Sequence, residues 1–224
     1  MMATVIHPRL PPRRGGVGGT WWSKAFLRAV EELAFSAPEL KRGRRHARAG
    51  DVGAITVGDG SFVAAVFDGD DAFTVTGSVP LLGSDDQSVL VELVAAEAGR
   101  IAALMSGELP HSLVEAMEEA GVELLPYGGE LGTTCTCESW LDPCPHALAV
   151  LTQVAWLTQR DPFVLLQLRG LARDELLARL HALDEHAGAG PGGAVVDDLA
   201  IAEEAALRAA RELAQLPDRP AEQE

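Results

Sequence analysis

Three cysteines and one histidine lie close together in the pattern C-x-C-x6-C-x-H, and these are all the cysteines of the chain. Three thiolates and one imidazole make a complete tetrahedral set for a structural zinc ion of the Cys3His type. The alternative is three free cysteines that pack as small hydrophobic residues, and it leaves the spacing unexplained. The pattern therefore predicts one structural zinc ion bound by Cys135, Cys137, Cys144 and His146.

The spacing also suits the local backbone that it requires. In an extended segment, Cys135 and Cys137 point to the same side and can bind one ion from the end of a strand. Pro145 suits the first position of a helix, which places His146 in the first turn. The positive end of that helix favours a thiolate at Cys144. We therefore expect a small ββα knuckle around the metal.

This pattern resembles that of the SWIM zinc fingers, C-x-C-x(n)-C-x-H. The chain is similar in particular to small bacterial SWIM-finger proteins that accompany SWI2/SNF2-type helicases, and the likeness covers most of residues 18–180. The other matching segments are Gly19-Thr20-Trp21-Trp22, Arg42-Gly43-Arg44, Ala47-Arg48-Ala49-Gly50, Asp161-Pro162-Phe163 and Leu168-Arg169-Gly170. The resemblance implies a binding module and a partner of the SWI2/SNF2 helicase or ATPase type.

The chain departs from the family pattern at three places. Pro145 stands where a lysine is usual between the last cysteine and the histidine, and His46 stands where an aromatic is usual. Asp68-Gly69-Asp70-Asp71 replaces a stretch that often resembles Gly-Ser-Arg. These differences remove positive charge, which argues against direct contact between the finger and nucleic acid.

The net charge of −15 is unevenly distributed. Residues 1–50 hold ten of the 18 lysines and arginines but only three of the 33 acidic residues. The acidic remainder would repel phosphate and suits a basic protein partner or solubility alone. The one dense basic patch consists of Lys41, Arg42, Arg44, Arg45 and Arg48. It could bind phosphate or an acidic protein surface, could be a solvated charge run, or could pair with the acidic body of the chain.

Hydrophobic periodicity predicts an α+β fold. Three runs rich in Val, Ile, Phe and Thr, separated by Asp-Gly turn signals, predict a small antiparallel β-meander over residues 53–57, 62–67 and 72–76. Val122 to Leu125 could form a further short strand. Helices are expected over residues 21–35, 84–106, 110–120, 147–158, from Asp161 to a break at Arg169-Gly170, and over 171–186. Trp21 and Trp22 could stack a base or bind a partner, or could simply belong to the core.

Composition suggests five regions. We expect a flexible N-terminal tail over 1–19, an α+β region over 20–130, the SWIM finger with its following helices over 131–186, a Gly-rich linker over 187–196 and an amphipathic helix with a polar tail over 197–224. That last helix could pack on its own body or on a partner. No membrane span and no secretory signal are evident, and thiols arranged for metal favour a cytoplasmic location.

Three classes of function are compatible with these features to different degrees. The first is a non-enzymatic zinc-binding adaptor that binds a SWI2/SNF2-type helicase, with DNA or RNA bound jointly. The second is a stand-alone nucleic-acid-binding protein that uses the basic patch, and its affinity would fall steeply with salt. The third, a zinc hydrolase, is disfavoured because four ligands leave no open position on the metal and no H-E-x-x-H pattern is present. We expect no enzymatic activity.

Overall fold

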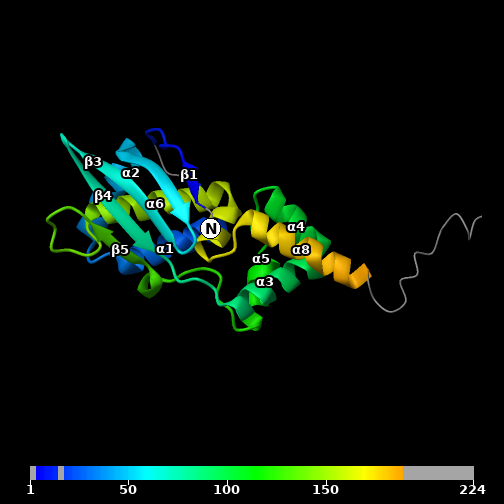
Figure 1. Cartoon of the computed structure of the whole chain (residues 1–224). Helices are drawn as coiled ribbons and strands as arrows, with labels where there is room; N and C mark the ends of the chain where they lie inside the picture. The colour runs from blue at the N-terminus through cyan, green and yellow to red at the C-terminus, as the bar shows by residue number, and fades with distance from the viewer. Residues whose placement is uncertain (1–3, 15–17, 189–224) are drawn as a thin grey trace, which may run out of the picture. The chain divides into compact units, whose positions relative to one another are not determined.

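The computed structural model describes residues 4–14 and 18–188. Its strands form one antiparallel sheet in chain order, β1-β2-β3-β4-β5 (Figure 1). Their bounds are Val5–His7, Val52–Gly58, Ser61–Asp68, Asp71–Ser78 and Gly132–Cys135. The predicted meander is confirmed as β2, β3 and β4, with Gly60 and Gly69 at positive φ in the two tight turns. The α+β fold class is likewise confirmed.

The first strand corrects the expectation of a flexible tail over residues 1–19. β1 pairs with β2, with Ile6 opposite Thr56, and Leu10 is buried in the core. Arg9 donates from its Nε to the carbonyl of Gly50 at 2.7 Å. The prolines and glycines of this segment suggested a tail, but proline is compatible with extended backbone, and the edge of β2 supplies hydrogen-bond partners.

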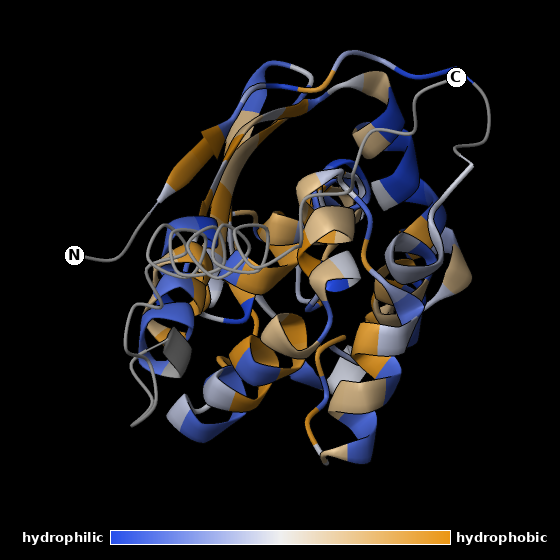
Figure 2. Ribbon diagram, turned by 90° about the vertical axis from the view of Figure 1, so that its right-hand side faces the viewer, coloured by the Kyte–Doolittle hydropathy of each residue, from blue (hydrophilic) through white to orange (hydrophobic). Residues whose placement is uncertain are grey.

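Helix α6, Pro145–Arg160, is the centre of the core. Every residue from Pro145 to Thr158 is buried, as expected for a segment that is apolar nearly all round. It packs against four of the strands and against α1, Trp21–Leu33, and α2, Ala37–Ala49. Figure 2 shows hydrophobic positions gathered where these elements meet. The helix that starts at the predicted metal ligands is therefore also the main packing element.

The predicted helix at Trp21 is confirmed as α1, with Thr20 as its N-cap. Trp22 is buried and donates from Nε1 to the carbonyl of Thr158 at 2.8 Å, which supports its core role. No helix was assigned to the basic patch, yet it lies on α2, which ends at Gly50 in the left-handed conformation. The many charged residues and the internal Gly43 leave this segment without the hydrophobic periodicity that predicts a helix.

Close packing of α2 on α6 depends on Gly43. A Cβ atom at this position would lie 2.6 Å from the Leu148 Cβ and 2.9 Å from the Pro145 carbonyl oxygen. Across the same pair of helices, Gln153 donates from Nε2 to the carbonyl of Ala47 at 2.9 Å. The glycine thus lets α2 approach the first turn of α6, where His146 lies.

The helix expected over residues 84–106 is instead two helices, α3, Ser84–Ala96, and α4, Ala98–Met105. Glu97 is extended between them, with φ −134° and ψ 112°. The Arg100 guanidinium explains the break, because it is buried and donates to the Leu93 carbonyl at the end of α3 at 2.6 Å. The next predicted helix is confirmed as α5, His111–Glu119.

Beyond α6, the predicted helix at Asp161-Pro162 is confirmed as α7, Pro162–Leu168, whose Phe163 N–H donates to the Asp161 side chain. The break at Arg169-Gly170 follows, and α8 spans Arg173–Gly188. Arg169 is buried and donates to the carbonyls of Pro80 and Glu123 at 2.9 and 2.7 Å. It therefore holds together two loops that are distant in sequence.

Val122 to Leu125 does not form the short strand considered from the sequence; Leu124 is buried within a loop. A short 3-10 helix, η1, Gly128–Glu130, leads into β5. Since β5 pairs with β4, the expected finger region and the expected N-terminal region share one sheet. The described residues up to His181 form one compact unit.

Residues 187 and 188 of the expected linker belong to α8. The rest of that linker, and the helix with its polar tail expected over 197–224, lie outside the described residues. Among the helices that the structure describes, none combines the length and apolar character needed to cross a membrane.

Replacing Gly43 with alanine should destabilise the protein by about 1–3 kcal/mol, because the added methyl group overlaps backbone atoms of α6. The urea midpoint of unfolding measures this effect. Gly99→Ala is the matched control, since Gly99 is an exposed position of α4 with open space around its Cβ position. That change should stabilise by up to about 1 kcal/mol. Equal midpoints for the two variants would contradict the close helix contact.

Candidate metal centre

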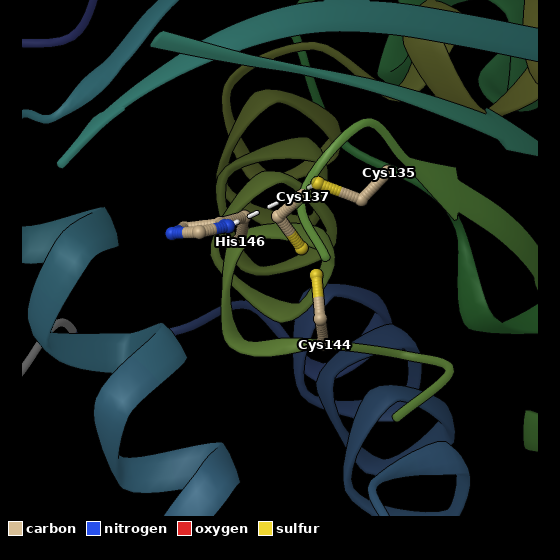
Figure 3. A group of neighbouring side chains, drawn as sticks. All are labelled: Cys135, Cys137, Cys144 and His146. Atoms are coloured by element: carbon tan, nitrogen blue, oxygen red, sulfur yellow. Dashed lines mark hydrogen bonds between the residues drawn. The ribbon is translucent and has the colours of Figure 1, made fainter. Parts of the chain in front are cut away.

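The structure brings Cys135, Cys137, Cys144 and His146 together. One ligand atom from each lies within 4.8 Å of the others, and the Cys135 Sγ is 3.9 Å from the His146 Nδ1 (Figure 3). Zinc bonds of about 2.3 Å to sulfur and about 2.0 Å to nitrogen imply donor separations of roughly 3.5–4 Å. The donor set and its spacing therefore fit one structural zinc ion.

Strand pairing places the first two cysteines. Cys135 ends β5 opposite Val75 of β4. The pairing extends one residue further, because Thr136 donates from its N–H to the Thr74 carbonyl and accepts from the Thr74 N–H at its Oγ1. Thr136 therefore stays bonded to β4 where the chain begins to bend, and Cys135 and Cys137 both reach the same ligand cluster, as the C-x-C spacing predicts. The knuckle takes its second strand from the meander.

The start of α6 places the other two ligands. Cys144 is the N-cap of this helix, and its sulfur accepts from the Ala147 N–H at 3.5 Å. Pro145 occupies the first turn, as expected, and His146 follows it. The loop between the two halves of the site is held by Thr133, whose hydroxyl donates to the Asp142 carboxylate at 3.0 Å. The helix N-terminus stabilises negative charge on the Cys144 sulfur.

The three thiols differ in acidity. Burial raises the pKa of Cys135 to about 12, and the neighbouring thiols oppose its ionisation further. Burial also raises the pKa of Cys144. Burial acts in the same direction on Cys137, but hydrogen bonds from the Ser139 amide, His146 and the other thiols outweigh it and lower its pKa to about 7. The metal-free cluster therefore retains protons that zinc must displace.

The far side of the His146 ring is held by the sheet. Its Nε2 lies 3.4 Å from the Asp68 carboxylate, at the turn between β3 and β4, and its ring stacks on Phe73 at 4.7 Å between centroids. Figure 3 shows this second ring nitrogen directed away from the thiols. A hydrogen bond from Nε2–H to the Asp68 carboxylate keeps the proton on Nε2 and leaves the Nδ1 lone pair free to bind the metal.

His46 of α2 is a neighbour that the sequence did not single out as functional. It is buried, its ring is 5.6 Å from that of His146, and its Nε2 is 4.0 Å from the Asp68 carboxylate. Its Nδ1 lies 2.9 Å from the carboxylate of Asp51. Asp51, His46 and Asp68 thus form a polar chain that ends on the metal ligand. The one feature of the sequence that could have indicated this role is the histidine at position 46, where the family usually has an aromatic residue.

The basic patch divides in the structure. Lys41, Arg42, Arg45 and Arg48 line one groove on α2. Arg44 does not line it, because it pairs with Glu31 of α1. Arg42 also has an acidic neighbour, Glu39, at 3.7 Å. Internal pairing, one of the alternatives considered from the sequence, therefore applies to part of the patch.

Zinc affinity should rise steeply with pH. In the metal-free protein, Cys135 and Cys144 keep their protons at neutral pH because their pKa values are raised, whereas zinc binds their thiolates. Each displaced proton contributes about tenfold per pH unit, so the association constant should increase about a hundredfold per unit above pH 7. Competition with a chromophoric chelator measures this constant.

The control is Cys144→Ser, which keeps an N-cap acceptor but removes one metal-binding thiol. It should lose most of the zinc that the wild-type chain retains at one ion per chain. A purified, folded wild-type chain without zinc, or an affinity independent of pH, would contradict the assignment.

Asp68→Ala should weaken zinc binding about tenfold to a hundredfold, because His146 loses the carboxylate that orients its ring. Asp70→Ala, in the same exposed turn, is the matched control and should bind zinc as the wild type does. The same chelator competition distinguishes them. Equal zinc affinities for the two variants would contradict the proposal that Asp68 orients His146.

Comparison with known proteins agrees with this geometry. The chain is 33% identical over 172 residues to the uncharacterized protein Rv2102 of Mycobacterium tuberculosis (strain ATCC 25618 / H37Rv). The match covers 75% of this chain and 61% of the relative, so the chain spans less than two thirds of that protein's length. No solved structure matches. Residues 118–155, which include all four ligands, match the SWIM zinc finger family.

Proposed function

We propose that this chain is a non-enzymatic, zinc-stabilised adaptor that binds a protein partner beside its finger. The observation that carries this proposal is a pair of solvent-exposed aromatic side chains. Trp140, in the loop between Cys137 and Cys144, is 82% exposed, and Phe35, just after α1, is 69% exposed. Their rings touch edge to face, with centroids 5.9 Å apart.

Exposure of this kind has a free-energy cost in an isolated chain. Large aromatic side chains are usually at least partly buried, and exposed ones that gather together mark contact surfaces. Tryptophan is also among the residues that contribute most to binding energy at protein interfaces. The zinc supports this role by folding the loop that carries Trp140, so that metal binding contributes to structure rather than to chemistry.

The partner that we propose is a SWI2/SNF2-type helicase or ATPase in the cytoplasm, with DNA or RNA bound jointly. The resemblance to the SWIM-finger proteins that accompany such enzymes supports this choice. Acidic residues at the turn between β3 and β4, Asp68, Asp70 and Asp71, suit a basic surface on that partner. Full occupation of the metal by four protein ligands supports a role without catalysis.

The runner-up is a stand-alone nucleic-acid-binding protein that uses the basic patch. The groove on α2 favours it, since four exposed cationic side chains of the basic patch line that surface. The two functions are distinguished by whether a captured protein remains bound to the chain after nuclease treatment.

The test is capture of the tagged chain from its own cytoplasm, with nuclease, followed by reconstitution with the purified partner. An ATPase of the SWI2/SNF2 type should remain bound, and Trp140→Ala should weaken the reconstituted complex at least about tenfold. Leu81→Ala, which removes another exposed hydrophobic side chain (53% exposed), is the control and should bind normally. Loss of all captured protein on nuclease treatment would instead favour the runner-up.

A further inference from the structure

A groove of about 740 Å³ lies between the segment that follows β1 and helix α2. Six cationic side chains line it: Arg13, Arg14, Lys41, Arg42, Arg45 and Arg48. Two of these, Arg13 and Arg14, come from the segment that the sequence assigned to a flexible tail. Folding thus joins two basic segments about thirty positions apart into one surface.

The wall formed by the N-terminal segment is held in place. Arg13 donates from its backbone N–H to the Arg48 carbonyl at 2.8 Å, and its guanidinium lies 4.7 Å above the centroid of the Trp156 ring. Pro12 packs against Gly50, where a Cβ atom would come within 3.2 Å of the proline ring. The groove is therefore preformed, which reduces the entropy lost when a ligand binds.

The positive charge of the groove is largely uncompensated. Within the part of the chain that the structure describes, Arg42 alone among the six has an acidic side chain within 4 Å, Glu39. Lys41, Arg45 and Arg48 are exposed on α2. Burial, and then the positive charge of Arg160, lower the pKa of Arg13. A polyanion would find several unpaired donors here, spaced along one helix.

Two polyanions could fit, and the lining favours one of them. An acidic peptide normally docks through an apolar pocket or an unpaired strand edge. Here one wall is helix α2 and the other is the segment after β1, and Trp156 lies beneath Arg13 and is 5% exposed. The lining also includes Pro12, Pro38 and Ala49, and its charged groups are guanidinium and ammonium groups, which bind phosphate without reading bases.

We propose that this groove holds the phosphate backbone of a single nucleic-acid strand, without sequence preference. The proposal deepens the nucleic-acid part of the proposed function and rests on it. Since aromatic platforms for base stacking are absent from the lining, the affinity comes from phosphate contacts and falls steeply with salt. The finger and the acidic turn between β3 and β4 are not the contacting surface.

The experiment measures anisotropy of a fluorescein-labelled oligothymidylate against the zinc-loaded full chain over a series of salt concentrations. The wild type should bind at low salt, with log K falling linearly against log salt. Arg45→Gln combined with Arg48→Gln should bind more weakly and reduce that slope by about 1.4, or about 0.7 for each phosphate contact. Both side chains are exposed, so zinc content and the unfolding midpoint should stay at wild-type values.

The matched control is Lys24→Gln combined with Arg28→Gln, which removes two exposed cations of α1 outside the groove. It should bind as the wild type does. No oligothymidylate binding at low salt, or equal losses in both double variants, would overturn the proposal. The proposal would also be overturned if the groove variants weakened the binding of polyglutamate but not that of oligothymidylate. That result would favour an acidic protein segment as the ligand.

These outcomes are separable from those of partner binding. Trp140→Ala should leave oligothymidylate binding unchanged, because Trp140 does not line the groove. The Arg45→Gln, Arg48→Gln chain should still retain the ATPase after nuclease treatment. Failure of either measurement therefore identifies which of the two proposals is wrong.

Discussion

The rest of the structure depends on the burial of helix α6. Its N-cap, Cys144, and a residue of its first turn, His146, are metal ligands, and the helix then runs through the core with almost every side chain covered. A helix that is apolar all round gains stability only where other elements surround it. The sheet, α1 and α2 supply that cover, and each also contributes to a candidate site: Cys135 at the end of β5, Phe35 after α1 and the basic groove on α2.

Local chemistry was the part that the sequence could predict. The C-x-C spacing, the proline at the start of α6 and the N-cap Asp161 act within a few residues, and each produced the expected structure. The three meander strands were also predictable, because Asp-Gly turns and alternating side chains are local features. The structural zinc ion was predicted from the three thiols and one imidazole alone.

What the sequence could not predict depends on distant partners. Asp68 looked like a departure from the family pattern, yet folding places it on His146, 78 positions away. His46 reaches the same place only because Gly43 allows α2 to approach α6. β1 forms by pairing with the free edge of β2. The break between α3 and α4 at Glu97 accompanies a hydrogen bond from the Arg100 side chain to the Leu93 carbonyl of α3. None of these partners is adjacent in sequence.

The two edge strands have a consequence for self-association. β1 has three residues and β5 has four, whereas the three inner strands have seven or eight. Long, flat edges invite pairing with another chain and lead to aggregation, and short edges resist it. β5 ends at Cys135, and after one further bonded residue, Thr136, the chain turns into the metal loop. The metal loop therefore follows a short edge strand, which offers little free edge for pairing with another chain.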